Sequence, residues 1–246
     1  MTYAKYSASG NDFVIFHTFI EKDYSQEAVK YCNRNEGIGA DGFVALVPSN
    51  EADFKWLFYN SDGSEASMCG NATRAVAHYA FNNGLANSSM KFITQAGLIE
   101  SHVEENIVET QMTKPIVIKE PFEQEGLTWY LIDTGVPHLV TLADDLENYD
   151  HDLCSKMRYE HNANVNFAKV EKNGTLKVRT YERGVEGETL ACGTGMVACF
   201  LRANDLGLIK EKAFVYPKSN EELTISKIDE KIYFKGAVKK VFTTTV

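Results

Sequence analysis

YNSDGSEASMCGN, at residues 59–71, has a counterpart later in the chain, YERGVEGETLACGT at residues 181–194. In both stretches a tyrosine ends a strand-like run and a glycine-bearing loop follows. A glutamate then stands four residues before a Cys-Gly pair, and a helical pattern begins after the cysteine. The two cysteines, Cys69 and Cys192, lie half a chain length apart in a sequence of 246 residues. This arrangement predicts an internal repeat in which two similar lobes each present one cysteine.

The elements around these stretches are mostly strands. Alternating and β-branched runs predict strands at residues 13–18, 43–47, 54–59, 129–133, 164–170, 176–181, 223–228 and 232–234. An apolar stripe at helical spacing begins at Ala72 and stops near Asn83-Gly84. A second helix runs from about Gly195 to Leu206 with an unbroken apolar run, so it should be buried on most sides. We therefore expect an α/β (α+β) protein with many strands and few helices.

The boundary between the two lobes falls near residues 112–115, where a proline breaks the pattern. The sequence contains no low-complexity segment or obvious linker there. We assign residues 1–113 to an N-terminal lobe that carries Cys69. Residues 114–234 then form a C-terminal lobe that carries Cys192.

The charge and hydropathy of the chain exclude two classes of partner. The formal net charge is −9 and lysines and arginines are scattered, which argues against a nucleic-acid partner. The chain has no signal-peptide pattern, and its apolar runs are shorter than the roughly 18 residues of a membrane span. We therefore expect a soluble cytoplasmic protein with no membrane partner.

The cysteine and histidine content favours free thiols over disulfides or a metal site. The five cysteines are an odd number in a chain too large to need disulfide staples, which suits a reducing compartment. The sequence has no Cys-x-x-Cys pair, and its six histidines do not show metal-ligand spacing. We expect no metal in the functional site.

Each repeated cysteine precedes a helix, and this position changes its chemistry. Unpaired N–H groups and the helix dipole lower the pKa of a thiol at a helix N-terminus and make the thiolate accessible. Gly70 and Gly193 have no Cβ, so a ligand can approach the first N–H groups of each helix, where a carboxylate can bind. Each motif thus supplies a proton carrier beside an anion site.

Two such motifs facing one amino acid would invert its α-carbon. The carboxylate of the substrate could be shared by two helix N-termini while the thiols flank the α-carbon from opposite sides. One cysteine would remove the α-proton as a thiolate, and the other would deliver a proton to the opposite face as a thiol. Fixed dipoles would stabilise the enolate-like charge, so pyridoxal phosphate is not needed and we expect no cofactor.

A structural explanation exists for the same residues, since free cysteine is among the most buried residue types. The repetition of the whole context favours function for Cys69 and Cys192. Glu65 and Glu188, the glutamates of the repeated stretches, also fit a role in orienting their loops. The remaining cysteines lack the context and are assigned to the interior: Cys32, Cys154 and Cys199.

Eight short motifs in order along nearly the whole chain resemble those of the diaminopimelate epimerase family. They lie at residues 9–13, 37–42, 60–65, 69–71, 137–138, 164–167, 182–184 and 191–195. The resemblance implies interconversion of LL- and meso-2,6-diaminopimelate by two cysteines, in the synthesis of lysine and of peptidoglycan precursors. It also implies two pseudo-symmetric lobes, each a curved, mostly antiparallel sheet around a central helix, with the active site in the cleft between them. The last strand, residues 235–246, should return to the first lobe.

The resemblance also implies the roles of individual residues. The non-reacting end of the substrate would be held by Asn11, Asn60, Asn164 and Arg183. The reacting carboxylate would lie against Gly70, Asn71, Gly193 and Thr194. His138 and Glu182 would adjust the protonation of the cysteines, and Glu182 would also contact the substrate. The chemistry agrees, because a guanidinium can clamp a distal carboxylate and amide side chains can hold a distal ammonium group.

Local sequence offers structural alternatives for several of these residues. Asn11 and Asp12 fit a turn before a strand. His138, after a proline, fits a surface loop. Glu182 and Arg183 fit an exposed ion pair that contributes little stability.

Three positions depart from the pattern of the family. Val136 stands before Pro137 where an asparagine is common, and Gly42 stands where some members have glutamine. The loop from Glu182 to Cys192 holds one residue more than in many members. All three concern the distal end of the substrate more than the proton transfer.

Two other functions compete with this interpretation. A two-cysteine racemase or epimerase for proline or hydroxyproline is one, although Arg183 would then lack a second carboxylate to bind. A redox-responsive binding protein, in which the paired thiols bridge across a ligand cleft, is the other. The sequence also allows a homodimer through an exposed edge strand.

Overall fold

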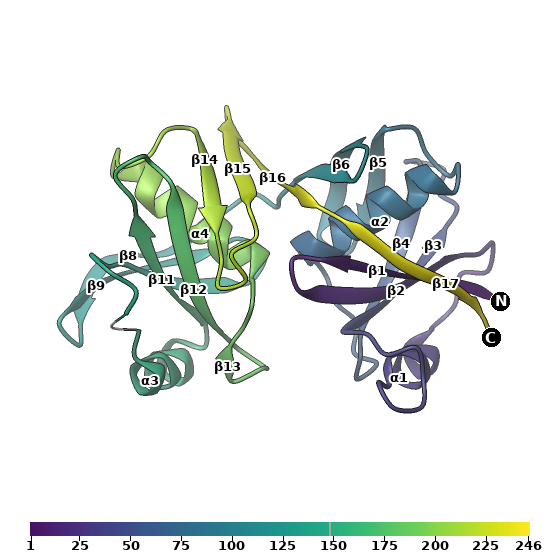
Figure 1. The fold of residues 1–246 in the computed structure, drawn as a ribbon, viewed down its shortest axis with the longest axis horizontal. Coiled ribbons are helices and arrows are strands. Elements are labelled where there is room, and N and C mark those ends of the chain that lie inside the picture. The colour runs from purple at the N-terminus through teal and green to yellow at the C-terminus, as the bar shows by residue number, and fades with distance from the viewer. Residues whose placement is uncertain (148) are drawn as a thin grey trace. The chain divides into compact units, whose positions relative to one another are not determined.

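The computed structural model describes residues 1–147 and 149–246, and the chain divides into two compact units. The first unit comprises residues 1–111 and 235–246, and the second comprises residues 112–234. Both units combine strands with two helices, so the described residues contain four helices beside a mixed parallel and antiparallel sheet (Figure 1). No helix among the described residues is long and apolar enough to cross a membrane.

The first unit alternates antiparallel and parallel strand pairs. Its elements are β1 (Thr2–Ala8), β2 (Asn11–His17), α1 (Ser25–Cys32), β3 (Gly42–Val47), β4 (Phe54–Asn60), α2 (Gly70–Asn82), β5 (Ser89–Thr94), β6 (Gly97–Glu104), β7 (Ile107–Gln111) and β17 (Lys239–Thr245). The pairs β1–β2, β3–β4 and β5–β6 are antiparallel, whereas β2–β3 and β4–β5 are parallel. A helix connects each parallel pair, α1 for the first and α2 for the second, as parallel strands require a crossover.

The second unit has the same order of pairings. Its elements are β8 (Ile116–Gln124), β9 (Leu127–Asp133), β10 (Pro137–Leu142), α3 (His151–His161), β11 (Asn164–Val170), β12 (Leu176–Glu182), β13 (Gly187–Glu188), α4 (Gly193–Asp205), β14 (Lys212–Tyr216) and β15 (Leu223–Ile228). The pairs β9–β10, β11–β12 and β14–β15 are antiparallel, whereas β10–β11 and β12–β14 are parallel. Here α3 and α4 make the crossovers. The repeat in the sequence therefore corresponds to a repeat in topology.

The helices that follow the repeated cysteines are buried in their own units. Helix α2 contacts β1, β2, β6 and β7, and α4 contacts β9, β10, β11, β12 and β14. Small residues let strands approach α2 closely, since Ala72, Ala75 and Ala77 are completely buried. Helix α4 is buried from Gly193 to Leu201, as its apolar run predicts. Helix α2 is buried on more than its apolar stripe, because Arg74 and Thr73 are also fully enclosed.

The sequence did not predict α1 or α3, and it placed several boundaries differently. Helix α3 has few buried residues and a strongly polar composition, so its apolar pattern is weak. Its start is defined by Asp150, whose side chain accepts hydrogen bonds from two backbone N–H groups of the first turn. The terminal segment is also not one strand. Strand β16 (Lys231–Ala237) ends before Val238, and β17 then pairs antiparallel with β1 in the first unit.

Candidate active site

Both repeated cysteines occupy the N-cap position of a buried helix. Cys69 has extended backbone angles, φ −152° and ψ 116°, and so has Cys192, with φ −122° and ψ 107°. Their carbonyl groups accept the first helical hydrogen bonds, at 2.9 Å each. Cys69 is half-buried, whereas Cys192 is only 8% exposed. In each unit the thiol therefore stands where the N–H groups of the first helical turn and the helix dipole favour a negative charge.

The other three cysteines lie in the interior, as the sequence predicts. Burial raises the pKa of the Cys32 thiol to about 12 and that of Cys154 to about 12. The pKa of Cys199 is also raised by burial. A thiol with such a pKa stays protonated near pH 7, so these three side chains are packing residues.

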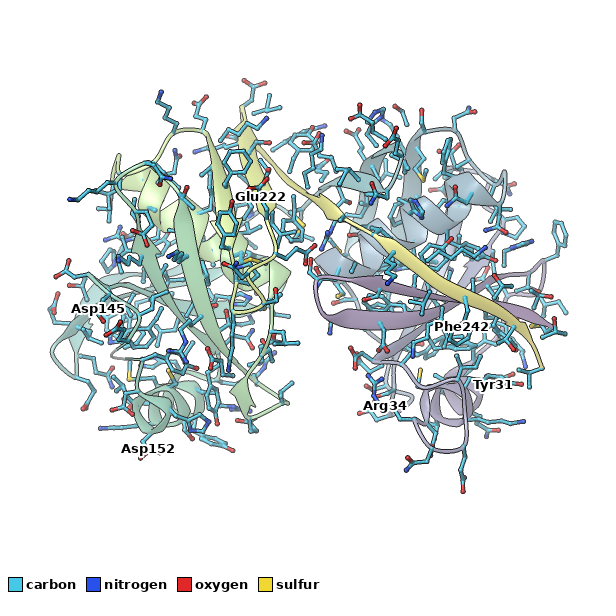
Figure 2. The ribbon with its side chains drawn as sticks, viewed as in Figure 1. Tyr31, Arg34, Asp145, Asp152, Glu222 and Phe242 are labelled. Atoms are coloured by element: carbon cyan, nitrogen blue, oxygen red, sulfur yellow. The ribbon has the colours of Figure 1, made fainter. Side chains whose placement is uncertain are left out.

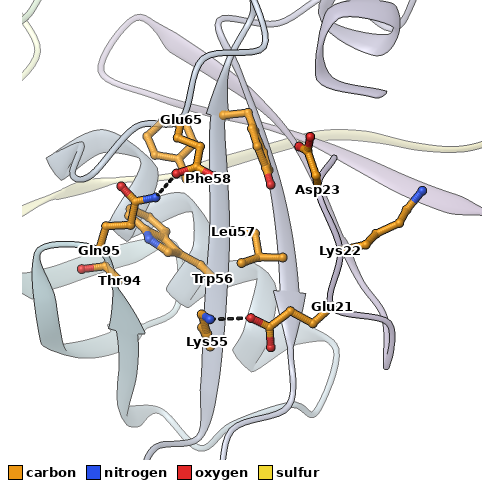
Figure 3. A pocket seen from close by; sticks show the side chains of 11 residues that line it. Glu21, Lys22, Asp23, Lys55, Trp56, Leu57, Phe58, Glu65, Thr94 and Gln95 are labelled. Atoms are coloured by element: carbon orange, nitrogen blue, oxygen red, sulfur yellow. Dashed lines mark hydrogen bonds and ion pairs between the residues drawn. The ribbon is translucent and has the colours of Figure 1, made fainter. Parts of the chain in front are cut away.

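The glutamate of each repeated stretch braces the loop before the cysteine. Glu65 forms a bridge with Tyr59 and accepts a 2.6 Å hydrogen bond from Gln95, beside a cavity of about 430 Å³ (Figure 3). Glu188 pairs with Tyr181 in the equivalent place. Its carboxylate accepts two hydrogen bonds from Arg179, at 2.6 and 2.8 Å, and one from Lys218, in the loop between β14 and β15, at 2.5 Å. These contacts support the interpretation that both glutamates orient their loops.

In the first unit a chain of amides leads from the start of α2 to the surface. The buried Arg74 donates a 2.6 Å hydrogen bond to Asn71 Oδ1, and Asn71 Nδ2 donates at 2.8 Å to Asn11 Oδ1. Asn11 Nδ2 then donates to Asp41 at 3.0 Å. Because Arg74 can only donate and the Asp41 carboxylate can only accept, the orientation of both amides is fixed.

Charged groups surround the outer end of this chain. Arg34, labelled in Figure 2, follows α1. It binds Asp12 through both terminal nitrogens and contacts Asp41 at 2.7 Å. Lys5 also contacts Asp12 at 3.0 Å. Burial acts to raise the pKa of Asp12, but Arg34 and Lys5 bring the pKa below its usual value. Asn11 and Asp12 are the first residues of β2 and belong to a network of hydrogen bonds and ion pairs. The turn lies just before them, at Ser9 and Gly10, so the alternative of a turn at Asn11 and Asp12 is wrong.

Asn60 lies at the exposed end of β4, in the loop that leads to the cysteine. Its side-chain amide donates to Ser64 Oγ at 3.0 Å, and its backbone N–H donates to the carbonyl of the same serine at 2.8 Å. The loop thus holds this amide close to the strand end.

In the second unit a buried chain of polar groups ends on the cysteine. Cys192 Sγ lies 3.6 Å from Thr194 Oγ1, which lies 2.9 Å from His138 Nε2. The other ring nitrogen of His138 lies 3.1 Å from Asn166 Nδ2, and Asn166 Oδ1 accepts a 2.9 Å hydrogen bond from Thr180. The structure therefore brings His138 and Thr194 to Cys192, with the histidine acting through the threonine.

His138 is a core residue, so the alternative of a surface loop is wrong. It lies in β10 and is completely buried. Burial lowers its pKa to about 3; the hydrogen bond with Asn166 opposes this shift and the positive charge of Arg183 adds to it. The imidazole is neutral near pH 7, so it can orient hydrogen bonds but cannot supply a charge.

The ends of β10, β11 and β12 come together around Asn164. Asn164 Nδ2 donates to the Pro137 carbonyl at 3.3 Å, and Asn164 Oδ1 accepts from the Arg183 backbone N–H at 2.8 Å. The guanidinium of Arg183 donates to the Asn162 carbonyl at 3.0 Å. Glu182 accepts a 2.5 Å hydrogen bond from Thr189. Glu182 therefore has a partner in the loop that leads to Cys192, and Arg183 has one at the C-terminal end of α3.

Four residues that shape these networks were not singled out from the sequence: Asp41, Arg74, Asn166 and Thr180. Asn166 and Thr180 occupy alternating strand positions that a periodicity analysis assigns to the core. Polar residues at such positions were one signal, and Asn166 also stands in the motif at residues 164–167, but neither gave it a role. Among the described residues, no three His, Cys, Asp or Glu side chains gather to hold a metal ion.

Comparison with known proteins adds a family match. The sequence matches the family model for diaminopimelate epimerase over residues 3–118 and 130–241. It is similar to the diaminopimelate epimerase of a Nitratiruptor species, with 55% identity over 99% of this chain and 98% of that protein. The identity is 51% with the enzyme of Campylobacter lari, covering 98% and 97%, and 43% with that of Helicobacter pylori, covering 98% and 94%.

Solved structures with little sequence identity share the fold. A hydroxyproline epimerase from Agrobacterium vitis matches with a TM-score of 0.76 and 13% identity, covering 99% of this chain and 91% of the other. A PhzF-family phenazine biosynthesis protein from Bacillus anthracis matches with a TM-score of 0.75 and 15% identity, covering 100% and 98%. At these identities the similarity concerns the fold alone.

Proposed function

The chain belongs to the diaminopimelate epimerase family, and from this premise we propose that Cys69 and Cys192 are the two acid–base groups of its active site. The function is that of a diaminopimelate epimerase, an isomerase that interconverts LL- and meso-2,6-diaminopimelate in lysine and peptidoglycan precursor biosynthesis. One observation carries the assignment of the site: each unit places one cysteine at the N-cap of a buried helix.

The finer architecture is part of this proposal. The N-terminal lobe comprises residues 1–113 with the C-terminal segment at residues 235–246, and the C-terminal lobe comprises residues 114–234. Each lobe is a curved sheet around one central helix, α2 or α4, and each lobe presents one cysteine to the substrate. The common order of strand pairings in the two units supports a shared design.

The reaction needs two proton carriers and no redox change. A cysteine thiolate takes the α-proton, so that an S–H bond forms and the electron pair of the broken C–H bond moves toward the carboxylate. The other cysteine then loses its S–H proton to the opposite face of the α-carbon and becomes a thiolate. The reverse reaction exchanges the two roles.

The helix starts stabilise the charge that develops during this transfer. The first-turn N–H groups at Gly70 and Asn71, and those at Gly193 and Thr194, bind the reacting carboxylate. These four residues are buried, so the N–H dipoles act in a region of low dielectric constant. The enolate-like intermediate gains more from them than the substrate does.

The distal end of the substrate binds to polar groups that are already oriented. The amides of Asn11 and Asn164 are held by Asp41 and by the Arg183 backbone N–H. With Asn60 they contact the distal amino and carboxylate groups, and the Arg183 guanidinium pairs with the distal carboxylate. Glu182 contacts the substrate ammonium group and, with His138, adjusts the protonation of the cysteines.

Deuterium incorporation from heavy water tests the site. Reduced wild-type protein, Cys69→Ala and Cys192→Ala are each incubated with LL-diaminopimelate, without cofactor or metal. We expect wild-type epimerisation with deuterium at the α-carbon, and loss of epimerisation in both variants. Full epimerisation by either folded variant would contradict the two-cysteine assignment.

The assembly state is a separate prediction. An exposed edge strand would allow a homodimer, and light scattering of the purified protein measures it directly. A monomeric protein at micromolar concentration would contradict the prediction of a homodimer. It would not affect the assignment of the cysteines.

A further inference from the structure

The buried polar chain beneath α4 is not required by the fold. His138 and Asn166 are completely buried and Thr180 nearly so, which costs free energy unless every polar atom finds a partner. Strand register places His138 opposite Asn164 and Asn166 opposite Thr180. In the first unit, the same register positions pair Phe13 with Gly42 and Val44 with Phe58.

The first unit thus fills the equivalent positions with apolar side chains. Phe13, Val44 and Phe58 belong to its hydrophobic core, with Ala72 three residues after the cysteine. The second unit has Gly195 at that helix position. A Cβ on Gly195 would lie 2.3 Å from Asn166 Oδ1, so alanine does not fit at this position beside the amide. Glycine is the poorer helix former of the two. The same backbone arrangement therefore accommodates either apolar or polar side chains at these positions. The polar side chains of the second unit lower its stability through the burial of polar atoms and the glycine in the helix.

The hydrogen-bond partners define where each proton lies. Asn166 Nδ2 faces the Leu139 carbonyl at 3.1 Å and Asn166 Oδ1 faces Thr180, which fixes the orientation of the amide. Asn166 Nδ2 then donates to His138 Nδ1. Since the ring is neutral, its single proton is on Nε2 and is donated to Thr194 Oγ1 at 2.9 Å.

The remaining proton in this chain belongs to Thr194. Its oxygen accepts from His138, which leaves its own O–H to donate to Cys192 Sγ at 3.6 Å. A hydrogen bond donated to sulfur stabilises the thiolate over the thiol. The positive charge of Arg183 acts on His138 and further opposes protonation of the ring.

Resting on the function proposed above, we infer that Asn166 is a positioning residue that fixes the Nε2–H form of His138. Through Thr194, this form makes Cys192 the thiolate of the resting enzyme. In the first turnover, Cys192 removes the α-proton from one isomer of the substrate. Cys69 is then the thiol that donates a proton to the opposite face of the α-carbon. The polar chain breaks the equivalence of two otherwise similar helix starts.

Nitrogen–proton correlation NMR of ¹⁵N-histidine-labelled protein measures the proton position directly. The His138 signals are assigned with His138→Gln, and the test variant is Asn166→Asp, whose carboxylate accepts a proton from Nδ1. We expect Nε2–H in the wild type and Nδ1–H in Asn166→Asp. The Thr194 hydroxyl would then donate its hydrogen bond to the unprotonated Nε2 and no longer to Cys192 Sγ.

Alkylation kinetics test the consequence at sulfur. The rate of Cys192 modification by iodoacetamide is followed against pH in substrate-free protein, with Cys69 measured in the same samples as the control. In Asn166→Asp we expect Cys192 to react on the order of tenfold more slowly at pH 7, with Cys69 unchanged. Should Asn166→Asp fail to fold, Thr194→Val also removes the hydrogen bond from Thr194 to Cys192 Sγ. We expect the same slowing of Cys192 alkylation in that variant.

The outcomes separate this inference from the proposed function. Nδ1–H in wild-type His138, or an unchanged Cys192 profile in the folded variants, would overturn the inference while wild-type epimerisation stands. Equal slowing of Cys69 and Cys192 would also overturn it, because a general loosening of the fold would explain both. Absence of α-proton exchange in the wild type would instead count against the proposed function.

Discussion

The two units share an order of elements but surround their cysteines with different chemistry. In the first unit the residues after Cys69 join an amide chain that runs from the buried Arg74 to the carboxylate of Asp41. In the second unit a neutral chain leads through His138 and ends at Cys192. The backbone repeat sets where a thiol and an anion site can stand. The side chains around it decide what each thiol does.

The difference extends to the interior of each unit. Polar residues of the second unit stand where the first has Phe13, Val44 and Phe58. A repeat that only needed stability could keep the apolar set in both places. The polar set is therefore not explained by stability, and its hydrogen bonds end at Cys192.

The largest expected effect tests whether the two cysteines are equally necessary. Cys69→Ser and Cys192→Ser should each lower kcat for epimerisation by roughly 10²–10⁴-fold, because a hydroxyl is a poor proton carrier near pH 7. The measurement is the rate of conversion of LL- to meso-diaminopimelate under reducing conditions. A matched control is Cys199→Ser in α4, which should lose stability but keep the two-base chemistry. Activity lost only at one of the two helix starts would show that the repeat is not functional.

The next effect concerns acid stability and follows from His138. Its pKa is about 3 in the folded protein, against 6.5 in an unperturbed side chain. Between pH 3 and pH 6.5, His138 is therefore protonated in the unfolded chain but neutral in the folded protein. Stability from the neutral ring is thus complete above about pH 6.5. Below about pH 6.5, the free energy of unfolding falls by about 1.4 kcal/mol for each pH unit.

Replacing the polar pair with its first-unit equivalents should remove this slope. The double variant His138→Phe/Asn166→Val carries the Phe13 and Val44 side chains into the second unit. Between pH 6.5 and pH 4.5 it should lose about 2 kcal/mol less of its unfolding free energy than the wild type does. Urea unfolding at both pH values measures this. Equal losses in both proteins would mean that His138 is not buried as a neutral ring.

Arg74 provides the third comparison, since Val197 stands at the equivalent position of α4. Arg74→Met leaves the buried oxygens of Ser9 and Asn71 without the donor they now have. We expect a loss of about 2–4 kcal/mol in unfolding free energy, measured by urea titration. The freed Asn71 amide should also raise KM for diaminopimelate. A stable variant with unchanged KM would show that the charge does not orient this amide.

Sequence patterns were sufficient for the elements with strong periodicity. The strands at residues 164–170 and 223–228 and the buried second helix lie where predicted, because alternation in the strands and a continuous apolar run in the helix leave few alternatives. Helices α1 and α3 were missed, since each buries only two side chains. The motifs placed Cys69 and Cys192 correctly at helix starts. Asn166 and Arg74 could not be assigned a role, because only the fold brings to them partners from distant segments, such as Thr180 for Asn166 and Ser9 for Arg74.

The smallest effect compares the two loop-bracing glutamates. Glu188 has a side chain only 9% exposed, and although burial acts to raise its pKa, its contacts with Arg179 and Lys218 bring the pKa below its usual value. Glu65 binds only the neutral Gln95 among its described side-chain partners, in an exposed position. We therefore expect Glu188→Gln to cost about 1–3 kcal/mol and Glu65→Gln less than about 0.5 kcal/mol.

The pH dependence of these two variants separates charge from shape. Because the pKa of Glu188 is lowered, its stabilising contribution is present at neutral pH and is lost as the pH falls through the folded pKa. The difference between Glu188→Gln and the wild type should therefore shrink toward pH 3, while Glu65→Gln stays close to the wild type throughout. Thermal unfolding at pH 7 and pH 3 measures both. If the two variants behaved alike, the loops would be braced by their backbone pairing with Tyr59 and Tyr181, and the ion pairs of the second unit would serve another purpose.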